Sequence, residues 1–196
     1  NGRITSLILH NLQLKKLPSN LGDLSKLKKL STNSNQIASI PNSIGKLTNL
    51  IELNLHDNQL SNLPKSIGDL SQLKRLKVDR NNLSSLPKSI SKLKKLVKLQ
   101  INHNELKSLP NNICSINFDK NKMQSFISGN NYLCEDVPPC TEELPGFNYE
   151  YDSNGYPFYQ PQNCVICDPG FRGILHTSEN ITNSDGSSCF YKSDLD

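Results

Sequence analysis

Aliphatic and polar positions repeat every 23 residues along the first part of the chain. The clearest marker of this period is an asparagine, which occurs at Asn35, Asn58, Asn81 and Asn104. Three consecutive segments, LIELNLHDNQL, LKRLKVDRNNL and LVKLQINHNEL, follow the pattern LxxLxLxxNxL in this register. We therefore predict a stack of repeated units that share one core, because no single unit can bury its apolar face alone.

Each unit is predicted to contain one short strand and one return segment. The LxL stretch alternates inward leucines with outward polar residues, which is typical of a parallel strand in a stack. The asparagine that follows is expected to turn the chain and to bond backbone groups through its amide, forming a ladder. The second half reads LPxxIGxLxxL, where proline prevents further strand pairing and the apolar period of three to four favours a short helix or 3₁₀ turn.

The repeats depart from the pattern at both ends. Thr32 replaces one core aliphatic residue, and Leu12 stands where the asparagine belongs, so one ladder rung is expected to be lost there. After Asn104 the next comparable asparagine is Asn121, only 17 residues on, in a shortened unit over residues 116–123. We predict at least five full repeats within residues 1–126, a carboxy-terminal cap over 127–145 and an acidic, irregular, cysteine-containing tail over 146–196. The start at Asn1, directly on a repeat, is interpreted as that of a fragment.

Charge is distributed unevenly along the chain. Residues 1–126 carry 20 Lys and Arg against 7 Asp and Glu, whereas residues 127–196 carry 2 against 11. A basic solenoid of this kind attracts acidic proteins or anionic glycans, or simply keeps its surface solvated. We expect a protein ligand, with an anionic glycan as the alternative and no nucleic acid. No apolar run reaches the length that spans a bilayer.

These motifs closely resemble the leucine-rich-repeat family, in its 23-residue class, over about residues 4–126. The resemblance implies an α/β horseshoe with a parallel sheet on the concave face, short helical or 3₁₀ segments on the convex side, and ligand recognition rather than catalysis. Family members bind unrelated ligands, so the resemblance does not identify the partner. The LPxxIGxL segments also resemble the repeats of intracellular scaffolds that bind Ras-like GTPases.

The cysteines of the tail resemble those of two kinds of extracellular module. GNNYLCEDVPPC, residues 129–140, resembles the carboxy-terminal cap of plant-receptor-type leucine-rich-repeat proteins, which implies a disulfide between Cys134 and Cys140. CVICDPGFRG, residues 164–173, loosely resembles the second half of an epidermal-growth-factor-like module, which implies that Cys167 pairs with Cys189. Cys164 is left to bond Cys114 or a cysteine outside the sequence.

Two asparagine positions, like the cysteine motifs, favour an extracellular recognition module. Asn82 and Asn180 each begin an N-glycosylation sequon, which suits a secreted or cell-surface protein. A secreted inhibitor of an extracellular hydrolase is a third hypothesis beside the receptor-like module and the intracellular scaffold.

The candidate ligand-binding residues are those that project from the concave face of the three central repeats. This set comprises Glu52, Asn54, His56, Asp57, Arg75, Lys77, Asp79, Arg80, Lys98, Gln100, Asn102 and His103. His56 and Asp79 fall on neighbouring rungs and are expected to hydrogen-bond, without an aligned nucleophile. No enzyme activity is predicted, because the sequence offers no nucleophile aligned with a base and no paired carboxylates set in a cleft. No cofactor or metal site is predicted either, because the CxxC at Cys164 and Cys167 lacks a second half-site.

Overall fold

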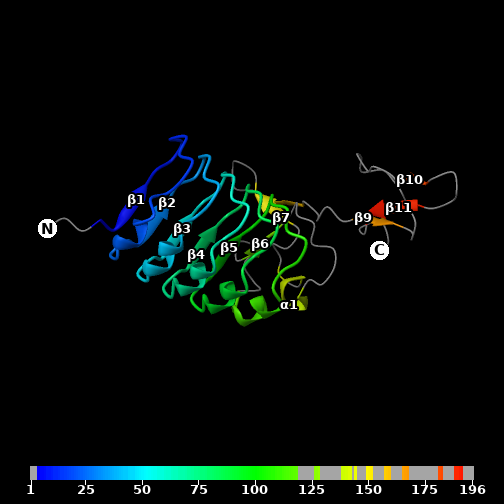
Figure 1. Cartoon of the computed structure of the whole chain (residues 1–196). Helices are drawn as coiled ribbons and strands as arrows, with labels where there is room; N and C mark the ends of the chain where they lie inside the picture. Colours follow the sequence, from blue (N-terminus) through cyan, green and yellow to red (C-terminus); the bar gives the residue numbers. More distant parts are fainter. Residues whose placement is uncertain are drawn as a thin grey trace.

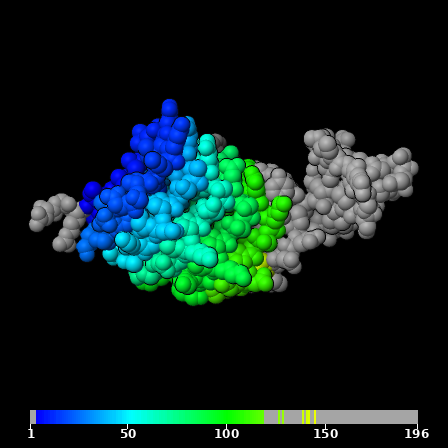
Figure 2. Space-filling view, in the orientation of Figure 1, coloured from blue at the N-terminus to red at the C-terminus, as the bar shows by residue number. Residues whose placement is uncertain are grey.

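The computed structural model describes residues 4–118 and the shorter segments 126–128, 138–142, 144, 149–151, 157–159, 165–167, 181–182 and 188–191. One six-stranded parallel sheet runs along the stack in sequence order (Figure 1). Its strands are β1 (Ser6–Ile8), β2 (Lys29–Ser31), β3 (Glu52–Asn54), β4 (Arg75–Lys77), β5 (Lys98–Gln100) and β6 (Phe126–Ile127). The repeats follow one another as consecutive bands of surface from blue to green (Figure 2). The predicted leucine-rich-repeat solenoid is therefore confirmed.

Short 3₁₀ helices form the side of the stack opposite the sheet. They are η1 (Leu21–Asp23), η2 (Asn42–Lys46), η3 (Lys65–Asp69), η4 (Lys88–Lys92) and η5 (Asn111–Ser115). From η2 onward each helix is preceded by a proline in extended conformation, such as Pro64 at φ −66° and ψ 148°. Proline ends strand pairing and fixes a backbone angle compatible with the turn, as the sequence predicted.

The core lies between the sheet and the 3₁₀ helices and consists almost entirely of leucine and isoleucine. Strand pairing places each inward leucine in register with the next, as in Leu53 opposite Leu76 and Leu76 opposite Leu99. These three side chains are completely buried. Burial of apolar surface at every repeat, about 25 cal/mol per Å² of area removed from water, is the main term that stabilises the stack.

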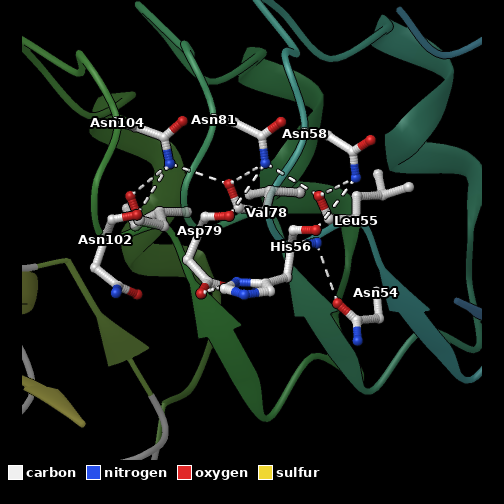
Figure 3. Close-up of polar contacts among 10 residues, drawn as sticks. Asn54, Leu55, His56, Asn58, Val78, Asp79, Asn81, Asn102 and Asn104 are labelled. Atoms are coloured by element: carbon white, nitrogen blue, oxygen red, sulfur yellow. Dashed lines mark hydrogen bonds and ion pairs between the residues drawn. The ribbon is translucent and has the colours of Figure 1, made fainter. Parts of the chain in front are cut away.

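An asparagine ladder connects successive repeats, as predicted. In Asn81, Nδ2 donates to the carbonyls of Leu55 and Val78 at 3.1 and 3.0 Å, and Oδ1 accepts from the Leu60 N–H at 3.0 Å. Figure 3 shows the amides of Asn58, Asn81 and Asn104 aligned above these carbonyls. One side chain thus satisfies backbone groups of its own repeat and of the preceding one.

A close approach between 3₁₀ helices explains the glycine of the return segment. A Cβ on Gly45 would lie 2.8 Å from both Cβ and the carbonyl oxygen of Ser66 in the next repeat. Ser91 takes the glycine's place in η4, and there the next repeat carries Asn112, whose Nδ2 donates to Ser91 Oγ at 2.9 Å. The hydroxyl group of Ser91 therefore has a hydrogen-bond partner in the next repeat.

The strand of the last unit lies beyond the shortened repeat motif. The motif at residues 116–123, interpreted from the sequence as the end of the array, has no strand at residues 116–118, and β6 instead places Phe126 in register with Leu99 and Ile127 with Gln100. Ile116 instead follows η5, and Phe118 packs against Phe126 with ring centroids 5.3 Å apart. The aromatic pair fills the end of the core, so the local motif similarity at residues 116–118 was misleading.

The cap contains a disulfide different from the expected one. Cys140, at α1 (Pro139–Glu142), bonds Cys114 in η5, so the predicted pairing of Cys134 with Cys140 is wrong. Cys114 occupies the glycine position of the last return segment, where its side chain faces the end of the stack rather than a further repeat. The bond therefore joins the cap directly to the final 3₁₀ helix; Cys134 and Cys164 lie outside the described residues.

The tail contains two small antiparallel sheets rather than only irregular chain. β7 (Tyr149–Tyr151) pairs with β8 (Pro157–Tyr159) in an antiparallel arrangement. β9 (Val165–Cys167), β10 (Ile181–Thr182) and β11 (Ser188–Tyr191) form the other sheet. Its register places Cys167 directly opposite Cys189. Their pairing as a disulfide stays a prediction.

Removing one ladder amide tests the importance of this contact. We expect Asn81→Ala to lower the free energy of unfolding in urea by about 3 kcal/mol, because it leaves buried backbone groups of two repeats without partners. The matched control is Asn62→Ala, at an exposed loop position, with an expected change below about 0.5 kcal/mol. Similar losses in the two variants would contradict the ladder's structural role.

The cap disulfide gives a second prediction. Peptide mapping without reduction is expected to recover Cys114 linked to Cys140. The double variant Cys114→Ser with Cys140→Ser should be less stable than the parent by about 3 kcal/mol, since the bond closes a loop across a sequence separation of 26 residues. Recovery of a Cys134–Cys140 peptide, or an unchanged urea midpoint in the double variant, would show that this bond does not hold the cap.

Candidate functional site

The exposed side of the parallel sheet, here called the sheet face, presents four rows of polar side chains. The twelve predicted ligand-binding residues all belong to these rows. Strand register defines the first two rows, Lys29–Glu52–Arg75–Lys98 and Ser31–Asn54–Lys77–Gln100. The same 23-residue offset continues beyond the strands into Asn33–His56–Asp79–Asn102 and Ser34–Asp57–Arg80–His103. The structure therefore brings the predicted residues together on one surface.

Ion pairing organises the first row. Arg75 Nη2 and Nε donate to Glu52 Oε2 at 2.7 and 3.2 Å, while Lys29 Nζ lies 3.5 Å from Oε1. Burial alone would raise the pKa of Glu52, but the hydrogen bond and charge of Arg75, helped by Lys29, hold that pKa below its ordinary value. Glu52 is therefore ionised at neutral pH and neutralises part of the basic surface.

The third row contains the expected hydrogen bond between neighbouring rungs. His56 Nδ1 and Asp79 Oδ2 are 2.5 Å apart, and Asp79 is only 8% exposed. His56 is further fixed by its backbone N–H, which donates to Asn54 Oδ1 at 3.1 Å (Figure 3). With no nucleophile in this arrangement, we interpret the pair as a rigid polar contact on the sheet face.

Three acceptor atoms in the second and third rows have no hydrogen-bond donor within the described structure. They are Asp79 Oδ1, Gln100 Oε1 and Asn102 Oδ1, all buried as atoms. They belong to β5 and to the turns that follow β4 and β5, so they lie on adjacent rungs. A buried acceptor without a donor costs about 1–3 kcal/mol, so these three atoms lower the stability of this part of the fold.

Positive charge is concentrated beside these acceptors. Arg75, Lys77 and Lys98 occupy adjacent positions of β4 and β5. Burial, and then the charge of Lys77, lowers the pKa of the Lys98 ammonium, while Asp79 acts in the opposite direction. The sheet face around β4 and β5 thus carries partly desolvated cations, which suit a ligand bearing carboxylates.

The fourth row has a backbone feature that sequence reasoning missed. Asp57, Arg80 and His103 all adopt positive φ, at 55°, 52° and 50°. This left-handed conformation turns the chain immediately before each ladder asparagine. The available signal was a polar residue at the position before every such asparagine, including Ser34, which has a φ of 54°. The turn projects Asp57 and Arg80 from the edge of the sheet face as exposed side chains.

Of the two predicted glycosylation sites, Asn82 is the one that lies within the described residues. Asn82 is exposed on the loop that follows β4, and its Nδ2 lies 3.4 Å from Glu105 Oε1. Asn180 lies outside the described residues.

Within the described part of the chain, no group of three metal-ligating side chains comes together. Nor does that part contain a helix long and apolar enough to cross a membrane.

A stacked parallel sheet, backed by 3₁₀ helices and held by an asparagine ladder, defines a repeat scaffold for recognition. The family model described as Leucine rich repeat matches residues 25–83 and 52–106. This chain belongs to the leucine-rich-repeat family. None of the curated proteins matches it.

Solved structures similar to this chain come from bacteria and plants. A leucine-rich-repeat protein of Leptospira interrogans is 26% identical, with a TM-score of 0.54 over 82% of this chain and 50% of its own. The Arabidopsis thaliana receptor kinase ectodomain GASSHO1/SCHENGEN3, in complex with CASPARIAN STRIP INTEGRITY FACTOR 2, is 31% identical with a TM-score of 0.61, covering 72% of this chain. The chain spans 17% of that ectodomain.

The Arabidopsis BIR3–SERK2 complex provides a similar structure of more comparable length. It is 31% identical to the chain, with a TM-score of 0.55, and the match covers 70% of this chain and 74% of the other.

The ion pair of the first row predicts a pH-dependent effect. We expect Arg75→Gln to raise the pKa of Glu52 toward 4.5, the value without such partners, when the carboxyl carbon is titrated by NMR. Since the folded pKa is depressed, the pair stabilises the fold above about pH 4.5 and this contribution disappears as pH falls through the folded pKa. Arg80→Gln is the control and should leave the Glu52 titration unchanged. An unmoved pKa in Arg75→Gln would contradict the interaction.

Proposed function

We propose that this chain is an extracellular or cell-surface recognition module that binds a protein ligand on its sheet face. The observation that carries the proposal is the group of charged and amide side chains that β4 and β5 place side by side on the sheet face. A folded protein or peptide supplies carboxylates for the cations of this group and backbone polar groups for its amides. A polyanionic glycan would also meet the carboxylates of Glu52 and Asp57 on the same face, which repel it.

The similar structures support a role in protein binding. GASSHO1/SCHENGEN3 was solved in complex with CASPARIAN STRIP INTEGRITY FACTOR 2, and BIR3 in complex with SERK2. These partners are properties of those proteins. They support, for this chain, the general use of the same scaffold as a binding surface, while the ligand itself has to be inferred from the side chains present here.

Two arginines are the strongest candidates for contacts with ligand carboxylates. Arg80 is exposed and takes part in none of the ion pairs found among the described residues. Arg75 is 45% exposed in its side chain, and its guanidinium has donors beyond those bonded to Glu52. A planar guanidinium bonds a carboxylate through two parallel donors, so these two residues favour a ligand with acidic side chains.

The cysteine and asparagine positions support the extracellular location. A disulfide between Cys114 and Cys140 persists in an oxidising compartment and is rarely retained in the cytosol. The exposure of Asn82 makes its sequon accessible to glycosylation. Both features favour a secreted or surface protein over an intracellular scaffold for Ras-like GTPases.

Matched double variants test recognition by the sheet face. The immobilised chain is used to isolate a partner from the extracellular proteins of the source organism, and the purified partner is then titrated. We expect Arg75→Gln with Arg80→Gln to weaken binding about tenfold or more, as loss of charged contacts at an interface centre does. Lys65→Gln with Lys88→Gln, on η3 and η4, removes the same charge from the opposite side and should change the dissociation constant less than about twofold.

The comparison between the two double variants is decisive. Equal losses would mean that the partner responds to net charge rather than to the sheet face. Loss only in the 3₁₀-helix variant would move the binding surface to the other side of the stack. Circular dichroism and urea unfolding of each variant establish that the substitutions act on binding and not on folding.

A further inference from the structure

We propose that one lateral edge of the stack binds an anionic polysaccharide, through a surface separate from the sheet face. This edge, here called the lysine edge, consists of the connections from each 3₁₀ helix to the following strand, residues 25–28, 48–51, 71–74 and 94–97. These connections carry five exposed lysines: Lys26, Lys28, Lys74, Lys94 and Lys95.

The lysine edge has no carboxylate of its own. None of its four connections contains Asp or Glu, and Asp23 and Asp69 belong to the 3₁₀ helices that precede two of them. The ion pairs found among the described residues do not involve any of the five lysines. Positive charge is therefore uncompensated along this edge, whereas Glu52 and Asp79 offset part of it on the sheet face.

A groove of about 380 Å³ opens in the middle of the lysine edge. Lys28 and Lys74 line it from connections two repeats apart, and the half-buried Ile51 lies between them in the chain of backbone hydrogen bonds. The remaining lining residues carry hydroxyl or amide groups: Thr48, Asn49, Ser71 and Gln72. The groove therefore offers hydrogen-bonding groups between two cations.

The spacing of the lysines follows from the stack. The parallel strands that begin beside Lys28, Ile51 and Lys74 lie about 4.8 Å apart, which places Lys28 and Lys74 about 10 Å from each other. This separation is close to the length of two linked sugar residues. An extended acidic polysaccharide lying along the edge would bring its sulfates or carboxylates repeatedly beside ammonium groups.

The side chains of the groove favour a polysaccharide over a single-stranded nucleic acid. Binding of unpaired bases depends on aromatic side chains on which the bases stack, and the residues that line this groove include none. Sugar hydroxyl groups instead match the amides of Asn49 and Gln72. Both amides are already held in place, since Asn49 Nδ2 donates to the Ser25 carbonyl at 2.8 Å and Gln72 Oε1 accepts from Lys95 Nζ at 2.6 Å.

The test measures binding of defined oligosaccharides to the whole chain by calorimetry at about 0.1 M salt, where exposed charges are screened beyond about 10 Å. The probes are a heparin octasaccharide, which bears sulfates, an octamer of galacturonate, which bears carboxylates, a neutral dextran octamer, and a single-stranded DNA octamer for comparison. We expect one or both acidic probes, but not dextran, to bind. Lys28→Gln with Lys74→Gln should weaken this binding about tenfold, and the relative affinity of the two acidic probes identifies the preferred oxyanion.

Two charge-matched controls make the result specific. Lys65→Gln with Lys88→Gln, and Arg75→Gln with Arg80→Gln, remove the same charge from the 3₁₀ helices and the sheet face, and each should change the affinity less than about twofold. The second control also separates this proposal from protein binding on the sheet face. Equal losses in all three variants, absence of binding by both acidic probes, or equally tight binding of single-stranded DNA through Lys28 and Lys74 would overturn the proposal.

Discussion

The amide of one asparagine per repeat determines whether the chain can turn away from the sheet without leaving buried backbone groups unpaired. Asn58 illustrates the constraint, because its Nδ2 bonds the carbonyls of Thr32 and Leu55 and its Oδ1 accepts from the Ile37 N–H. Only a side chain with both donor and acceptor atoms at this length can satisfy the two repeats simultaneously. The strand, the return segment and the leucine core all require this turn.

The regular stack also separates residues that build the fold from those available for binding. Inward positions carry aliphatic side chains at nearly every repeat, while the rows on the sheet face vary from Lys29 to Glu52 to Arg75 without any change of backbone. The residues proposed to bind a ligand therefore rest on a support that the leucine core provides.

The features that depend on the repeat could be predicted from the sequence. The predictions failed where the repeat stops. The strands, the 3₁₀ helices, the ladder and the contact between His56 and Asp79 follow from residues 23 positions apart. The bond between Cys114 and Cys140 does not, because it depends on how the cap folds onto η5. The position of β6 was missed because residues 116–118 imitate the repeat locally, while the aromatic pair that fixes the strand involves Phe126, eight residues beyond Phe118. Whether a buried side-chain oxygen finds a donor depends on its rotamer, which the spacing of residues in the sequence does not specify.

The ladder also bears on how such a chain changes in evolution. Each asparagine bonds only its own repeat and the one before it, and it meets the same backbone atoms at Asn58, Asn81 and Asn104. A duplicated 23-residue unit inserted within the array would therefore find its contacts already provided on both sides. Gene duplication can lengthen the protein and add new side chains to its surface without the need to redesign the core. The disulfide at the end of the stack is not part of the repeat, since Gly22, Gly45, Gly68 and Ser91 occupy the position of Cys114 in the earlier units, so the last unit cannot be replaced by a copy of an inner one without loss of this bond.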